Sequence, residues 1–139
     1  MFREDLSLEA INQMGKSTLV EHLGIEITEV GKDYLIGRMP VDHRTHQPFG
    51  ILHGGASVAL AETLGSIAAT FTLNLKEQHC VGLDINANHI KGVRSGYVYG
   101  KTTSLHIGRR TQVWEVKITN EAAELVCISR ITMAIIDNK

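Results

Sequence analysis

The segment from Gly55 to about Leu73 is apolar at nearly every position, and this feature constrains the fold more than any other. Wound into a helix, it would present apolar side chains on nearly every side, and a helix of that kind is buried. We therefore predict a long central helix enclosed by the rest of the chain. Its apolar residues are Ala56, Val58, Ala59, Leu60, Ala61, Leu64, Ile67, Ala68, Ala69 and Phe71.

The segments on both sides of this helix have the pattern of strands. Residues 24–41 are typical of a β-hairpin, and residues 111–119 alternate between apolar and polar positions. The order predicts an α+β fold in which an antiparallel sheet wraps around the central helix, in a single domain over residues 1–139. Outside these elements we expect a short helix capped by Ser7, a loop over 42–52, and strands at about 79–89, 97–106 and 124–136.

Composition excludes several classes of protein. The formal net charge is −1 with charges spread along the chain, whereas a nucleic-acid-binding face is strongly basic. No apolar run reaches the roughly 20 residues that span a bilayer, and the N-terminus lacks the features of a secretion signal. Cys80 and Cys127 lie in apolar stretches without metal-binding spacing, so we expect reduced core cysteines in a cytoplasmic protein. The unpaired edges of such a sheet favour a two-fold dimer.

Glu62 lies in the middle of the predicted buried helix, where an unpaired carboxylate is costly unless it has a role. Ser66 follows four residues later on the same helical face. Together they would place a carboxylate and a hydroxyl on one stripe. The alternative is a solvated helix face or a structural pairing of Glu62.

The segment from Gln47 to Gly55 runs directly into the start of this helix. The first N–H groups of a helix have no partner within it, and the helix dipole favours negative charge there. The amide of Gly54 or Gly55 could therefore hold an oxyanion. Alternatively, His53-Gly54-Gly55 is only a tight turn and helix cap.

Residues 47–66, QPFGILHGGASVALAETLGS, resemble the signature of hot-dog-fold thioesterases of the PaaI-like branch. The resemblance extends over essentially the whole chain, including residues 21–25 and 82–89. It implies an acyl-CoA thioesterase acting on an aromatic acyl group, such as hydroxybenzoyl or 1,4-dihydroxy-2-naphthoyl, the latter in menaquinone biosynthesis. It also implies a homodimer or a dimer of dimers and no cofactor, because coenzyme A is part of the substrate.

The resemblance assigns roles to five residues. Glu62 would attack the thioester carbonyl or activate the water that does, while the Gly54 amide binds the carbonyl oxygen. Gln47 and His53 would place the thioester and the carboxylate, and Ser66 would assist hydrolysis. Related sites are built across a dimer interface, so Glu62 would act with Gln47, His53 and Gly54 of the partner subunit.

The resemblance further implies contacts with coenzyme A. Two arginines in one turn suit phosphate oxygens, although a solvated turn is the plainer interpretation of such a pair. His89 would lie beside the substrate, although a histidine at a strand end is often only a polar contact. The run His89-Ile90-Lys91-Gly92 departs from the family, in which an Arg-Pro pair often follows the histidine. Lys91 keeps the positive charge but lacks the bidentate fork of an arginine. The expected contacts are Gly82, His89, Ile90, Lys91, Gly92, His106, Ile107, Gly108, Arg109, Arg110 and Thr111.

Two functions other than hydrolysis are known for this fold. A non-catalytic acyl-CoA-binding module would need no Glu62, and a hydratase would want an Asp/His pair on the helix. A metal site at Asp42, His43 and His46 lacks a third and fourth ligand at suitable spacing. The acyl group itself cannot be read from the sequence.

Overall fold

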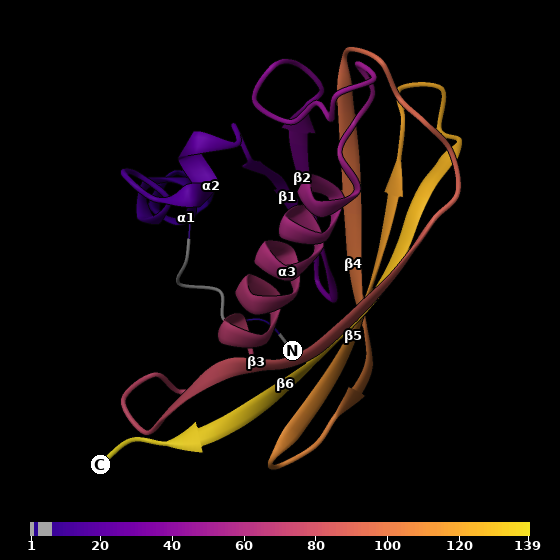
Figure 1. The fold of residues 1–139 in the computed structure, drawn as a ribbon. Coiled ribbons are helices and arrows are strands. Elements are labelled where there is room, and N and C mark those ends of the chain that lie inside the picture. Colours follow the sequence, from indigo (N-terminus) through magenta and orange to yellow (C-terminus); the bar gives the residue numbers. More distant parts are fainter. Residues whose placement is uncertain (1, 3–6) are drawn as a thin grey trace.

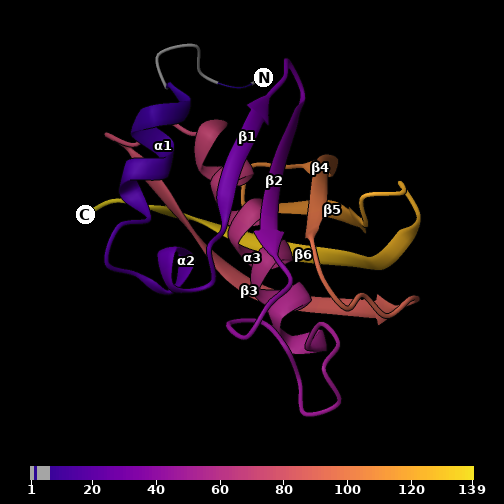
Figure 2. The same ribbon diagram turned by 90° about the horizontal axis from the view of Figure 1, so that it is seen from above.

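The computed structural model describes residue 2 and residues 7–139. All strands belong to one antiparallel sheet of six strands, in the order β1-β2-β4-β5-β6-β3. The sheet curves around the long helix α3, while α1 and α2 lie next to β1 (Figures 1 and 2). The helices are α1 (Leu8–Met14), α2 (Leu19–His22) and α3 (Gly54–Phe71), and the strands are β1 (Glu26–Val30), β2 (Tyr34–Pro40), β3 (Gln78–His89), β4 (Tyr97–Ile107), β5 (Thr111–Thr119) and β6 (Leu125–Asp137).

The predicted fold class is confirmed, and the predicted elements agree closely with the observed ones. The hairpin over 24–41 is the β1–β2 pair, and each later strand differs from its predicted bounds by only a residue or so. The predicted cap of α1 is also present, because the Ser7 hydroxyl oxygen accepts the Ala10 N–H at 3.1 Å. In the described part of the chain, no helix is long and apolar enough to cross a membrane.

Glycines in the sheet allow α3 to approach closely. A Cβ atom at Gly37 of β2 or at Gly100 of β4 would lie 2.5 Å from a methyl group of Leu64. Because both positions lack a side chain, Leu64 of α3 occupies the space between the two strands and is completely buried. This contact fixes the position of the helix on the sheet, and with it every side chain that the helix presents.

A polar chain of hydrogen bonds crosses the core beside α3. The Trp114 indole N–H donates to the Gln112 side-chain oxygen at 2.9 Å, and the Gln112 NH₂ donates to the Thr72 hydroxyl at 2.8 Å. Trp114 is therefore a core residue whose N–H is satisfied. Both cysteines are free, with Cys127 buried as predicted and Cys80 only partly buried.

The prediction that α3 is buried on all sides is wrong for the single chain. The sheet covers one side of the helix, and Glu62 is exposed on the other side. Ser66, Ile67 and Thr70, one to two turns later on the same side, are half-buried. The sequence pattern misled because Val58, Ala59 and Ile67 occupy this side, so the helix looks apolar all round although one stripe remains uncovered. Glu62 is consequently accessible and not a buried carboxylate.

Candidate functional site

The loop before α3 is held rigidly, which fixes the residues that precede the helix. The buried Thr45 hydroxyl donates to the Pro40 carbonyl at 2.7 Å, and the His53 N–H donates to the Thr45 carbonyl at 2.8 Å. The His46 ring nitrogen Nε2 lies 2.9 Å from the Arg94 carbonyl oxygen, which ties the loop to the segment after β3. Gln47 and His53 are thus presented from a fixed backbone at the N-terminal end of α3.

Gln47 has its side-chain oxygen occupied within its own loop. That oxygen accepts the Phe49 N–H, and the Gln47 backbone N–H donates to the Ile51 carbonyl at 2.8 Å. The carboxamide of a glutamine offers two N–H donors besides its oxygen. Gln47 can therefore act as a hydrogen-bond donor toward a carbonyl oxygen or a carboxylate.

The first turn of α3 distinguishes between the two glycine amides. The Gly55 N–H donates to the His53 ring nitrogen Nδ1 at 2.8 Å, so His53 is the N-cap of the helix. Among the described residues, the Gly54 N–H has no acceptor. It lies at the positive end of the helix dipole, where an anionic oxygen is stabilised. Gly54, and not Gly55, is the amide that is free to hold an oxyanion.

His89 lies directly against Gly54. A Cβ atom at position 54 would be 2.9 Å from the His89 ring nitrogen Nε2, so only glycine permits this contact without a shift. Strand β3 ends at His89, and its end is thereby placed beside the start of α3. The structure brings Gln47, His53, Gly54 and His89 together at one end of the molecule.

Glu62 lies apart from this group within the same chain. It follows Gly54 by eight residues of continuous helix, which correspond to about 12 Å along the axis. One carbonyl carbon cannot contact both groups across that distance. Ser66 stands one turn further, and its hydroxyl has a weak acceptor, the Met133 sulfur at 4.0 Å. The five expected catalytic residues therefore form two half-sites in the single chain.

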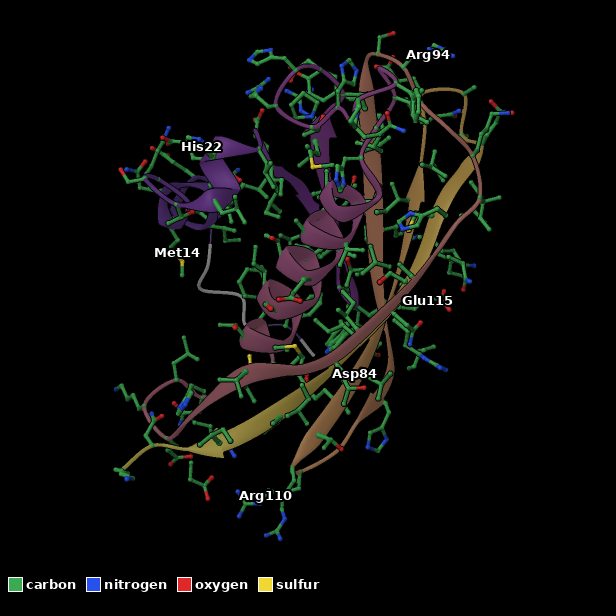
Figure 3. The ribbon with its side chains drawn as sticks, in the orientation of Figure 1. Met14, His22, Asp84, Arg94, Arg110 and Glu115 are labelled. Carbon is green, nitrogen blue, oxygen red and sulfur yellow. The ribbon has the colours of Figure 1, made fainter. Side chains whose placement is uncertain are left out.

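The expected coenzyme A contacts are also divided between the two ends of the sheet. Gly82 of β3 pairs with Met133 of β6, and Met133 pairs in turn with Gln112 of β5, which lies next to the β4–β5 turn. His89 of β3 pairs instead with Cys127 of β6, near the opposite end of the sheet. Gly82 and His89 are seven positions apart along the strand, or roughly 23 Å. Figure 3 shows Arg110 and Arg94 at opposite ends of the sheet. Residues 106–111 with Gly82 form one group, and residues 89–92 form the other.

Two of the expected phosphate-binding side chains have acidic partners of their own. Arg110 contacts Asp137 at 3.0 Å, and Lys91 contacts Glu124 at 3.2 Å, all four side chains being about half exposed. Hydrogen bonds from Asn120 and then from Lys91 lower the pKa of Glu124. Both basic groups would have to leave these partners, or share them, to bind phosphate.

Asp42 and His46, two of the candidate metal ligands, bond to other groups of the protein. Both oxygens of Asp42 accept hydrogen bonds from the Arg44 guanidinium, at 3.1 and 2.7 Å, and His46 is engaged with Arg94. Within residues 7–139, no group of three or more His, Cys, Asp or Glu side chains is arranged to hold a metal ion.

The Asp42–Arg44 pair gives a testable pH dependence. The Arg44 hydrogen bonds lower the pKa of Asp42 from 3.8 to about 2. Because the folded-state pKa lies below the ordinary value, this pair stabilises the fold fully above pH 3.8 and loses its effect as the pH falls toward 2. A carbon-detected NMR titration should show this low midpoint in the wild type and an upward shift toward 3.8 in Arg44→Ala. Arg110→Ala should leave the Asp42 midpoint unchanged, and an unshifted midpoint in Arg44→Ala would contradict the assignment.

The two roles of His53 can be separated by substitution. Asn is a good N-cap and should keep the helix start, so His53→Asn should melt near the wild-type Tm. His53→Ala should lose about 1 kcal/mol of unfolding free energy. If the His53 ring also contacts the substrate, kcat/KM should fall about tenfold in both variants, because a tenfold loss corresponds to the free energy of about one hydrogen bond. Full activity in His53→Asn would restrict His53 to capping.

Sequence reasoning missed two features of this end of the molecule. Phe49 is 85% exposed beside Gln47, and Arg94 anchors the loop through its carbonyl while its side chain is exposed. The turn signal Pro48-Phe49-Gly50, with a positive φ of 79° at Gly50, could have suggested an exposed aromatic ring at a loop tip. Nothing in the sequence indicated the contact between His46 and Arg94, because 48 positions separate the two residues.

The chain is similar in sequence and in structure to known thioesterases. The chain is 48% identical to 1,4-dihydroxy-2-naphthoyl-CoA hydrolase of Escherichia coli, over 98% of this chain and 99% of the relative. It is 49% identical to the proofreading thioesterase EntH of Cronobacter turicensis, over 97% of this chain and 98% of the relative. A crystal structure of a thioesterase from Haemophilus influenzae superposes with a TM-score of 0.95 at 49% identity, covering 98% of this chain and 94% of the other.

The Thioesterase superfamily matches residues 49–127, which include the start of α3, Glu62 and the end of β3. The similarity to full-length relatives extends over nearly the whole chain. The six-stranded sheet around α3 is the hot-dog fold of these enzymes. The chain therefore belongs to the Thioesterase superfamily and is a thioester hydrolase with the hot-dog fold.

Proposed function

We propose that this protein hydrolyses an aromatic acyl-CoA to the free acid and coenzyme A, with Glu62, Gln47, His53, Gly54 and Ser66 at the reacting centre. The observation that carries the proposal is the unpartnered Gly54 N–H at the start of α3, with Gln47, His53 and His89 around it. The aromatic acyl group is supported by the relative that hydrolyses 1,4-dihydroxy-2-naphthoyl-CoA.

In the proposed reaction, the thioester carbonyl oxygen accepts the Gly54 N–H, and the helix dipole stabilises the negative charge that develops on it. A Gln47 N–H is the second donor near this oxygen. The carboxylate of Glu62 attacks the carbonyl carbon, or takes a proton from the water that does so. If Glu62 is the base, the C–S bond breaks, coenzyme A leaves as a thiolate that takes the proton from Glu62, and the water oxygen ends in the product acid. If Glu62 is the nucleophile, the C–S bond breaks to leave an acyl–Glu62 anhydride, the thiolate takes up a proton from solvent, and water then hydrolyses the anhydride to the free acid and the Glu62 carboxylate. No cofactor takes part.

The proposed site requires a second copy of the chain, and the sheet edges indicate how it binds. The β1 edge is blocked, because the Asn12 carboxamide of α1 bonds the Ile27 N–H at 2.8 Å and the Ile27 carbonyl at 3.0 Å. Among the residues that the structure describes, none covers the β3 edge in this way, and Val81 and Leu83 of β3 are 45% and 61% exposed. An open edge with apolar side chains favours pairing with another strand. The dimer therefore forms through β3.

Antiparallel pairing of β3 with the β3 strand of a second copy would unite the divided groups. A two-fold axis near the middle of the strand places the Gly82 end of one chain beside the His89 end of the other. The β4–β5 turn of one chain then lies near residues 89–92 of its partner, so both could contact one coenzyme A. The same symmetry brings Glu62 of one chain toward Gly54 of the other.

A thiol-release screen tests the proposal directly. The purified protein is mixed with benzoyl-, 4-hydroxybenzoyl-, 1,4-dihydroxy-2-naphthoyl-, propionyl- and decanoyl-CoA, and free coenzyme A is measured with a thiol reagent. We expect the highest kcat/KM with the aromatic thioesters. Binding of acyl-CoA by calorimetry without thiol release would instead support the non-catalytic acyl-CoA-binding module, and a preference for decanoyl-CoA would overturn the aromatic assignment.

A further inference from the structure

Thr45 is buried although it lies in the loop between β2 and α3, and all of its polar groups are paired. The residue is only 2% exposed. Its hydroxyl donates to the Pro40 carbonyl at 2.7 Å and accepts the Asp42 N–H at 3.2 Å. Its backbone N–H donates to the Asp42 carbonyl at 2.9 Å, and its own carbonyl accepts the His53 N–H at 2.8 Å. A buried polar residue with every donor and acceptor satisfied makes its surroundings rigid.

The direction of the Gly54 N–H depends on the peptide unit that joins His53 to Gly54. This peptide is trans, so its N–H points opposite to the His53 carbonyl. That carbonyl accepts the N–H groups of Ala56 and Ser57, at 3.0 and 3.3 Å, in the first turn of α3. In the preceding peptide unit, the His53 N–H is held by the Thr45 carbonyl. The backbone is thus fixed on both sides of the peptide, and the Gly54 N–H is directed away from the helix.

The Thr45 hydroxyl connects this arrangement to the sheet. Pro40 is the last residue of β2 and pairs with Tyr97 of β4, so its carbonyl belongs to a fixed strand. A continuous series of hydrogen bonds therefore runs from Pro40 through Thr45 to His53. Oxyanion donors are effective because they are in place before the reaction, and a displacement of about 1 Å can lower the rate about 10²-fold.

We infer that Thr45 is a positioning residue for the hydrolysis: its buried hydroxyl anchors the loop to β2 and thereby holds the Gly54 N–H in the direction that binds the oxyanion. Thr45 acts through His53 and does not touch the substrate, because it is buried. This inference rests on the proposed function. It adds to it a residue outside the reacting centre.

The test removes the hydroxyl and keeps the shape of the side chain. In Thr45→Val, kcat for the best thioester of the screen should fall at least about tenfold with little change in KM, because the oxyanion forms only in the transition state. Thr45→Ser keeps the hydroxyl and should restore most of the kcat. An equal loss of kcat in Thr45→Val and Thr45→Ser would contradict a role of the hydroxyl.

Thr72→Val is the matched control, because Thr72 lies at the opposite end of α3 and has the same kind of partners. Its hydroxyl donates to the Ala69 carbonyl at 2.7 Å and accepts an N–H of the Gln112 side chain at 2.8 Å. Thr72→Val should therefore lower Tm about as much as Thr45→Val, yet leave kcat unchanged in assays well below both Tm values. If both variants lost kcat equally, the loss would follow from lower stability and the inference would fail.

Nuclear magnetic resonance tests the link between Thr45 and Gly54 without turnover. In protein with isotope-labelled glycine, the Gly54 amide resonance is assigned by its disappearance in Gly54→Ala. Thr45→Val should shift this resonance, whereas Thr72→Val should leave it in place. An unshifted resonance in Thr45→Val would overturn the inference and leave the proposed function standing. If the wild type released thiol from none of the thioesters, the proposed function itself would fail.

Discussion

Replacing Glu62 by Gln should lower kcat for the best aromatic acyl-CoA by about 10²–10⁴-fold, the usual contribution of a positioned general base. The amide keeps the size of the side chain but can neither attack the carbonyl nor take a proton from water. Because Glu62 is exposed in the single chain, the substitution should change the unfolding free energy by less than about 0.5 kcal/mol. Steady-state kinetics and a thermal melt measure the two effects.

Glu115→Gln is a suitable control for this change. Glu115 contacts Lys117 at 3.7 Å and projects from β5 on the side of the sheet away from α3 (Figure 3). Its substitution should leave kcat and KM unchanged. If Glu62→Gln retained turnover within a few-fold of the wild type, Glu62 would not be the reacting carboxylate, whatever the dimer geometry.

Gly54→Ala should lower kcat by about 10²–10³-fold, as expected when an oxyanion hole is disturbed. The new methyl group would lie 2.9 Å from His89 Nε2, so the His89 ring must move and the space beside the Gly54 N–H is reduced. When this variant is co-expressed with Glu62→Gln under a different affinity tag, purified mixed dimers should regain about half of the wild-type activity, because one of their two sites is intact.

The mixed dimer separates a shared site from a site within one chain. If Glu62 and Gly54 acted together in the same chain, every chain of the mixed dimer would carry one defect, and activity would stay at the level of the single variants. The helix itself argues against that outcome, since Gly54 and Glu62 are eight positions apart, which corresponds to about 12 Å along its axis. A mixed dimer without recovered activity would overturn the shared site.

Local patterns explain why so much of the fold could be predicted. The alternation at Thr111–Thr119 and the long apolar run at Gly54–Phe71 are properties of neighbouring residues. The turn signals also lie where expected, Gly96 directly before β4 and Asn120 directly after β5. The candidate residues were found for a related reason. Gln47, His53, Gly54 and Glu62 lie within sixteen positions of each other, so a short stretch of sequence carries the pattern.

What the sequence by itself determined is therefore the order and bounds of the elements and the chemical types of the candidate residues, because these follow from near neighbours along the chain. Only the tertiary structure decided which side of α3 the sheet leaves uncovered, and hence that Glu62 is accessible. It also decided that His53 occupies the Gly55 amide and leaves that of Gly54 free, and that the β4–β5 turn lies far from His89. These features depend on how distant segments pack, and no local pattern records that.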